Sequence, residues 1–150
     1  VHIHSSPVYT AELYARAVLG LREDDVIFSA AKLFFAYGLG NALSFPLAIG
    51  ATTVLMAERP TPDAVYRRLV EHRPTVFCGV PTLYAAMLAH APLPPRESLA
   101  LRICTSAGEA LPADVGRRFQ AAFGVDVLDG IGSTEMLHIF LSNRPDAVRY

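Results

Sequence analysis

The sequence predicts an α/β fold in which βαβ units build a mostly parallel sheet. Short apolar runs of strand length alternate along the chain with amphipathic stretches of helix length. Glycine, proline or a capping residue often stands where one element should stop and the next should start. The 150 residues are 52% hydrophobic and 18% charged, which is enough apolar material for a buried core.

The expected helices carry apolar stripes with recognisable ends. Thr61 and Pro62 form a capped start with proline in the first turn, and Gly20 and Gly124 follow two of the apolar stripes as stop signals. We therefore expect helices over residues 7–19, 38–47, 62–72, 81–88 and 112–123, with a proline-rich surface loop over residues 91–97.

The expected strands are short and rich in β-branched and aromatic side chains. They cover residues 26–29, 52–56, 75–79, 101–105, 125–131 and 136–141. Parallel strands joined by right-handed crossovers end at one edge of the sheet, and ligands of such sheets bind there. The segments after Ser29, Gly79, Thr105 and Ile131 are therefore the places where a site is expected.

Composition excludes several classes of function. Residues 33–57 carry no charged side chain and could span a bilayer by length, but Gly38, Pro46 and Gly50 favour a helix, a turn and a strand instead. The net charge of -1 argues against a nucleic-acid partner and against binding to anionic lipid. We expect no membrane and no nucleic acid among the partners.

The two cysteines indicate the redox compartment, and the two chain ends indicate whether the chain is part of a longer protein. Cys78 and Cys104 lie far apart in apolar runs, so we expect buried reduced thiols and a cytoplasmic location. The chain starts at Val1 without a signal-peptide layout and stops at Tyr150 without terminal character. We expect it to be part of a longer protein at both ends.

Three segments carry residues suited to chemistry. Asp129 to Glu135 runs from a strand into two glycines, two hydroxyls and an acid that suits Mg²⁺, although a plain strand-to-loop turn would look the same. Thr105 to Pro112 offers small residues against which a flat ring could lie, with Glu109 as a surface acid in the simpler interpretation. Ala31 to Asn41 sets aromatics beside small residues, which fits either an apolar pocket or core packing.

Taken in this order and after successive strands, the three segments resemble the adenylate-forming superfamily of acyl-CoA ligases, peptide-synthetase adenylation domains and luciferases. Ile131 to Glu135 is similar to its aromatic-Gly-x-Thr-Glu signature, and Ala107 to Ala110 to its Gly-Glu-Pro type loop. Val80-Pro81-Thr82 resembles its Val-Pro-Pro segment, and Val1 to His4 the stretch after its phosphate loop. Residues 34–41 and 129–138 look most like the benzoate- and hydroxybenzoate-CoA ligases.

The resemblance implies a two-step ligase reaction. An aromatic carboxylate and ATP would give an acyl-adenylate and pyrophosphate, and coenzyme A would then displace AMP. Residues 1–150 would form part of the AMP-binding domain, with the phosphate loop upstream and the domain that carries the catalytic lysine downstream. We therefore expect these 150 residues alone not to turn over, while a homodimer of the parent protein stays an open option.

The resemblance also assigns roles to residues. Thr134 would hold the α-phosphate and Glu135 would coordinate Mg²⁺, as the catalytic pair. The nucleotide would contact Ala107, Gly108, Glu109, Ala110, Asp129, Gly130, Ile131, Gly132, Ser133 and Thr134. The acyl pocket would be formed by Phe35, Ala36, Tyr37, Gly38, Gly132, His138 and Ile139, although a purely structural role for His138 is equally open. His2 and His4 are expected to lie outside the chemistry.

Two departures from the superfamily pattern favour the aryl branch. Many relatives have His where Phe35 stands and Tyr where Ile131 stands, and benzoate-type members share both changes.

A domain that loads an acyl or amino acid onto a carrier protein is an alternative function. For an amino acid it would need an acid in the pocket, which residues 35–38 lack. A non-catalytic nucleotide-binding module is another, but Gly38-Leu39-Gly40 lacks the third glycine of a dinucleotide motif.

Overall fold

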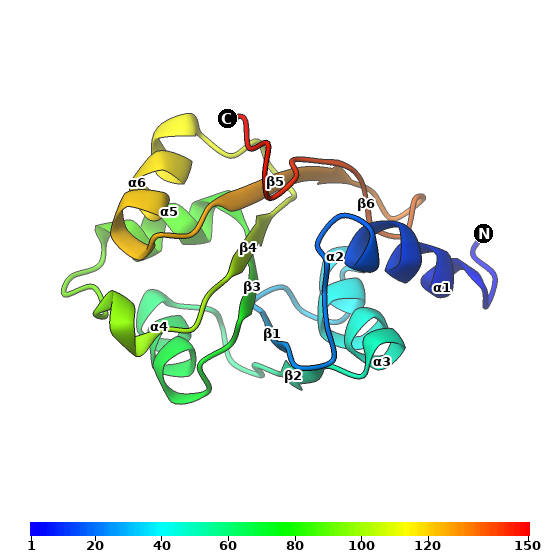
Figure 1. The fold of residues 1–150 in the computed structure, drawn as a ribbon, viewed down its shortest axis with the longest axis horizontal. Coiled ribbons are helices and arrows are strands. Elements are labelled where there is room, and N and C mark those ends of the chain that lie inside the picture. The colour runs from blue at the N-terminus through cyan, green and yellow to red at the C-terminus, as the bar shows by residue number, and fades with distance from the viewer.

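The computed structural model describes all 150 residues and contains one six-stranded sheet in the order β2-β1-β3-β4-β5-β6 (Figure 1). The strands β1 to β5 pair in parallel, and β6 alone runs antiparallel to its neighbour β5. The predicted α/β class with a mostly parallel sheet is therefore confirmed. The bounds are β1 Val26–Ser29, β2 Thr52–Val54, β3 Val76–Gly79, β4 Ile103–Ser106, β5 Val127–Gly132 and β6 Ile139–Ser142.

Helices cover both faces of the sheet, and each face has its own core. On one face α4 (Pro62–Glu71), α5 (Pro81–Ala89) and α6 (Ala113–Phe123) pack on alternate residues of the strands, such as Phe77 and Cys104. On the other face η1 (Ala11–Arg16) and α3 (Phe45–Ile49) pack on residues such as Val76 and Cys78, while α1 (Ser6–Thr10), which leads into η1, has no buried residue. A parallel sheet buried on both faces explains why its strands read as continuous apolar runs.

Most of the helices begin or end close to the capping, proline and glycine residues that the sequence indicated. The hydroxyl of Thr61 accepts a hydrogen bond from the amide of Ala64 at the start of α4. Gly50 and Gly124 end α3 and α6 with φ of 85° and 72°, a left-handed conformation that glycine adopts without strain. The uncharged stretch folds as α2 (Ala36–Leu39), η2 (Gly40–Ser44) and α3, then turns into β2. No helix has both the length and the apolar character that crossing a bilayer requires.

Two helical segments are wider than a regular α-helix. In η1 the amide of Ala17 donates to the carbonyl of Glu12 and that of Leu19 to Tyr14, both five residues back. The segment η2 has the same π-helical form, so the predicted helix 38–47 is in fact a composite that runs from Ala36 to Ile49. Such wide turns are often found at functional sites.

The prediction of a strand over residues 136–141 is wrong at its start, because β6 begins only at Ile139. Leu137 has φ of 68°, and its amide donates to the carbonyl of Thr134 over 3.1 Å. The hydroxyl of Ser133 accepts a hydrogen bond from the amide of Met136. These local bonds close a turn over residues 133–138 that competes with strand pairing. The predicted loop over residues 91–97 ends in a short 3-10 turn, η3 (Arg96–Ser98).

The amino edge of the sheet is closed by a buried carboxylate. Asp25 accepts hydrogen bonds from the Thr75 hydroxyl at 2.7 Å, from Nε of Arg102 at 2.8 Å and from the amide of Arg22 at 2.8 Å. Burial alone would raise the pKa of Asp25, but the bonds from Arg102 and Thr75 outweigh it and hold the pKa below its usual value. The segments that lead into β1, β3 and β4 are thereby tied together.

The two cysteines lie within the sheet, as predicted. Cys78 on β3 and Cys104 on β4 are free and buried, and they face opposite cores. Burial raises the pKa of Cys78 to about 12, so its thiol stays protonated at neutral pH and is unsuited to nucleophilic chemistry.

Candidate functional site

Segments predicted to carry chemistry meet at the carboxyl edge of the sheet around a cavity of about 170 Å³. They come from the start of α2, the loop after β4, the end of β5 and the turn that leads into β6. The edge is the one that the parallel topology predicts for a ligand. The lining residues are Phe35, Ala36, Tyr37, Ala107, Gly108, Gly132, Ser133, Thr134, His138 and Ile139.

Tyr37 is fixed in the wall of this cavity by β4. Its hydroxyl lies 2.6 Å from the hydroxyl of Thr105, and the hydroxyl of Tyr84 donates to the Thr105 carbonyl over 2.8 Å. Burial raises the pKa of Tyr37 well above its usual value, so the phenol stays neutral. The ring is therefore held as a flat, uncharged surface.

His138 forms a second wall and is 2% exposed. Its ring lies 4.5 Å from Phe45, 5.3 Å from Tyr14 and 5.5 Å from Tyr37, measured between ring centroids. Its Nε2 atom is 3.2 Å from the carbonyl oxygen of Tyr37. Burial lowers the pKa of His138 from 6.5 to about 4, so the ring is neutral at pH 7.

Gly40 makes room for this histidine. A Cβ atom at position 40 would stand 2.2 Å from Cδ2 and 2.6 Å from Nε2 of His138, closer than real contacts allow. The His138 ring is packed in an aromatic cluster and also lines the cavity, so its predicted place in an acyl pocket stays a prediction.

The loop after β4 presents small, exposed residues. Gly108 has φ of 96°, and a Cβ built there would meet no atom within 4 Å. The loop is tied to β5 because the carboxylate of Asp129 accepts a hydrogen bond from the amide of Leu111 over 3.1 Å. Glu109 and Ala110 are exposed beside Gly108, so the loop offers open backbone to solvent.

The turn over residues 133–138 presents the hydroxyl of Thr134 and the carboxylate of Glu135. Hydrogen bonds from its own backbone amide and from Ser133 lower the pKa of Glu135, so it is ionised at neutral pH. No group of three acidic, histidine or cysteine side chains could hold a metal ion by itself. A cation at Glu135 would therefore need further ligands, such as phosphate oxygens.

His2 contacts this turn, although sequence reasoning set it apart from the chemistry. Its Nε2 atom lies 2.8 Å from the carbonyl oxygen of Thr134. The residues are 132 positions apart, so no local pattern could have signalled the contact. His4 is exposed and makes no side-chain hydrogen bond.

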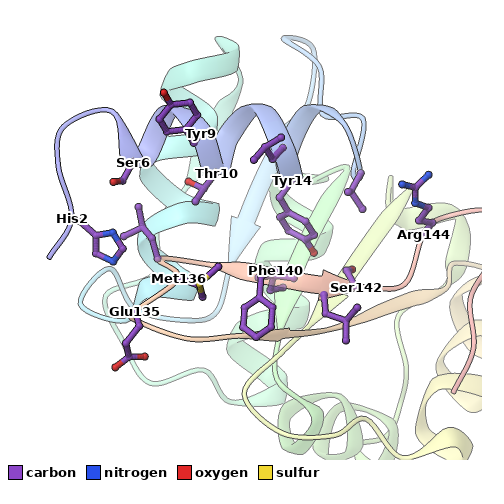
Figure 2. Close-up of a pocket in the computed structure, with 15 residues that line it drawn as sticks. His2, Ser6, Tyr9, Thr10, Tyr14, Glu135, Met136, Phe140, Ser142 and Arg144 are labelled. Carbon is purple, nitrogen blue, oxygen red and sulfur yellow. The ribbon is translucent and has the colours of Figure 1, made fainter.

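Two larger cavities lie nearby. One of about 540 Å³ shares Phe35, Tyr37, Ala107 and Gly108 with the small cavity and also contains Lys32 and Glu109. The other, of about 560 Å³, lies between α1–η1 and β6, where Figure 2 shows Tyr14 projecting from the helix toward Phe140 and Ser142. It includes only Glu135 and Ile139 of the predicted residues, so it is not where they converge.

Some predicted residues lie outside the small cavity. Gly38 is buried against the chain, since a Cβ there would stand 2.1 Å from the carbonyl oxygen of Lys32. Gly130 packs against Ile139, and Ile131 is 58% exposed. The residues predicted for the site that do not line this cavity are Gly38, Glu109, Ala110, Asp129, Gly130, Ile131 and Glu135.

Comparison with known proteins gives consistent matches over the whole chain. The family described as AMP-binding enzyme matches residues 1–150. The chain is 73% identical to a benzoate-CoA ligase of Thauera aromatica over 150 residues, which are 100% of this chain and 28% of that protein. The chain thus spans a little over a quarter of the length of that relative.

Solved structures agree with this match. A benzoate CoA ligase from Burkholderia xenovorans LB400 superposes with a TM-score of 0.98 at 69% identity, covering 100% of this chain and 31% of that one. The anthranilate CoA ligase AuaEII, solved in complex with anthranoyl-AMP, gives 0.93 at 42% identity, covering 99% and 29%.

The depressed pKa of His138 predicts a pH-dependent loss of stability. Between the ordinary pKa of 6.5 and the folded value of about 4, the unfolded chain binds a proton that the folded chain excludes, so stability falls as the pH falls through this window. We expect a loss of about 3 kcal/mol from this group between pH 7 and pH 4. Urea unfolding across that range measures it.

Two variants test this assignment. His138→Gln should make the free energy of unfolding depend less on pH, and His72→Gln, at an exposed position, should leave the pH dependence as it is in the unaltered chain. An unchanged pH dependence in His138→Gln would show that the loss comes from other groups.

Proposed function

Because the chain belongs to the AMP-binding enzyme family, we propose that its parent protein activates an aromatic carboxylate with ATP and passes it to coenzyme A. The first step joins the carboxylate to the α-phosphate and releases pyrophosphate. The second step exchanges AMP for the coenzyme A thiol, giving an aryl thioester. The parent would act in the metabolism of aromatic compounds, in the cytoplasm.

One observation carries this proposal. The loop at Gly108 follows β4 and the turn at Thr134 follows β5, and both border the same cavity as Tyr37 and His138. A cavity of about 170 Å³ suits a single ring, and the face of Tyr37 suits ring-to-ring contact. One molecule that joins a ring to a phosphate could therefore contact both halves at once.

The acyl half of the site supports an aryl acid over an amino acid. Phe35, Ala36, Tyr37, His138 and Ile139 would surround the ring, with Gly38 packed behind them and Gly132 leaving room for the carboxylate. None of the residues that line the cavity is acidic, so nothing there would pair with an α-ammonium group. An aryl adenylate found with a 42% identical ligase agrees with this choice.

The phosphate half of the site would stabilise charge. As the carboxylate attacks, negative charge grows on the phosphate oxygens, and fixed donors at Ser133 and Thr134 would stabilise it. Mg²⁺ bound with ATP would neutralise part of that charge, and Glu135 is the ionised side chain that would hold it.

The adenine would lie against exposed backbone. Ala107, Gly108, Glu109 and Ala110 would form one side and Asp129, Gly130 and Ile131 the other. Ile131 is an exposed aliphatic side chain at the end of β5, so it would contact the adenine without ring stacking. The Asp129 bond to Leu111 would keep the two sides at a fixed separation.

The experiment that tests the proposal is a substrate panel on the full-length parent. AMP release with ATP and coenzyme A should be fastest for benzoate or a hydroxy- or amino-substituted benzoate, and about 100-fold slower or more for acetate, which leaves the apolar wall uncovered. Comparable kcat/KM for acetate and benzoate would show that the flat pocket is not the acyl site.

Glu135 offers a direct test of the phosphate half. Glu135→Ala should lower kcat/KM for adenylation by roughly 100-fold or more, because the cation on the phosphates loses its protein ligand. Raising Mg²⁺ should restore part of the rate. Glu71→Ala, at an exposed position on α4, is the control for the loss of one carboxylate. Near-normal adenylation by Glu135→Ala would remove Glu135 from its proposed role.

A further inference from the structure

Lys32 is the only lysine among the 13 lysine and arginine residues of the chain. It lies in the loop between β1 and α2, and its side chain points to the segment that follows β2. Its Nζ atom donates to the carbonyl oxygens of Met56 at 2.6 Å, Ala57 at 3.2 Å and Glu58 at 2.6 Å. Two loops at the carboxyl edge are thus joined by one ammonium group.

The geometry of this contact requires an ammonium. Three carbonyl oxygens from consecutive residues converge on one nitrogen, which has three donors to satisfy them. A guanidinium spreads its donors over a plane and cannot direct three of them at a single centre. A chain that otherwise uses only arginine as its strong base thus has lysine at this position.

The loop that Lys32 holds leads directly into the wall of the small cavity. The amide of Phe35 donates to the Lys32 carbonyl over 3.1 Å, and that carbonyl also packs on Gly38. Ala36 and Tyr37 lie between these two contacts and line the cavity. A shift at position 32 would therefore move the residues proposed to surround the ring.

The segment on the other side of the contact is anchored to the core. Met56 is 6% exposed, and the carboxylate of Glu58 pairs with Arg68 at 2.6 Å and with Arg67 at 3.3 Å. Both arginines lie on α4, so the carbonyls that receive the ammonium are fixed to a helix. Through its hydrogen bonds to this segment, Lys32 fixes the position of the loop that leads into α2.

We propose that Lys32 is a positioning residue for the aryl acid, an inference that rests on the proposed function. All three donors of its ammonium are already used by backbone carbonyls, so it has none left for the substrate carboxylate. It acts by fixing Phe35, Ala36 and Tyr37. The turn at Thr134 and Glu135, which would bind the phosphates, lies between β5 and β6, so its position does not depend on Lys32.

The test uses the full-length parent with the variants Lys32→Met and Lys32→Arg and measures KM separately for benzoate and for ATP. In Lys32→Met the KM for benzoate should rise by about tenfold while the KM for ATP stays within about twofold. Partial unfolding would lower the active fraction and therefore kcat, but it would leave both KM values unchanged. The split between the two KM values thus separates positioning from stability.

Lys32→Arg keeps the charge and loses the convergent donors, so its KM for benzoate should rise nearly as far as in Lys32→Met. Arg59→Met is the control, because Arg59 is exposed in the same region and its side chain makes no hydrogen bond.

Two results would overturn the inference: an unchanged KM for benzoate in Lys32→Met, or equal increases in both KM values. Wild-type KM in Lys32→Arg would overturn the requirement for an ammonium. If the unaltered parent releases no AMP with any aryl acid, the proposed function itself is wrong and this inference falls with it.

Discussion

The site depends on the parallel pairing of β1, β3, β4 and β5. The register sets Ser29 beside Cys78, Gly79 beside Ser106, and Ser106 beside Asp129, so β1, β3 and β4 end almost in line, and β5 continues beyond them to Gly132. Every loop that leaves these ends starts from the same edge. At the opposite edge the buried carboxylate of Asp25 is hydrogen-bonded to Thr75 and to the partly exposed Arg102.

The site at the carboxyl edge has an apolar half and a solvent-exposed polar half. Tyr37 and His138 are neutral and held by packing, which suits an apolar ring that must lose its water. Gly108, Thr134 and Glu135 are exposed, which suits a hydrated nucleotide and its cation. The two halves meet within one cavity, and a reaction that links a ring to a phosphate needs this arrangement.

The features that could be predicted from the sequence are those that depend on the identity of neighbouring side chains. The strand periods, the cap at Thr61 and the glycine stops are local signals, and they gave the fold class and most element bounds. The start of β6 was missed, because the bond from the Met136 amide to Ser133 closes a turn within an apolar run. The π-helical turns were missed for a related reason, since an apolar stripe does not reveal a shift from four-residue to five-residue bonding.

The contacts that hold the site together are mostly between distant residues. Gly40 and His138 are 98 positions apart in number, and neither signals the other in the sequence. The acceptors for Lys32 are backbone carbonyls, which every residue has, so no motif marks them. The arrangement of these groups comes from the topology and becomes visible only in three dimensions.

The most direct measurement is a crystal structure of the full-length parent with a non-hydrolysable benzoyl-sulfamate analogue of the aryl adenylate. The ring should lie between Tyr37 and His138 in the cavity of about 170 Å³, with the sulfamate beside Thr134 and the adenine on Gly108. A ring bound instead in the cavity of about 560 Å³ between α1–η1 and β6 would contradict the central claim.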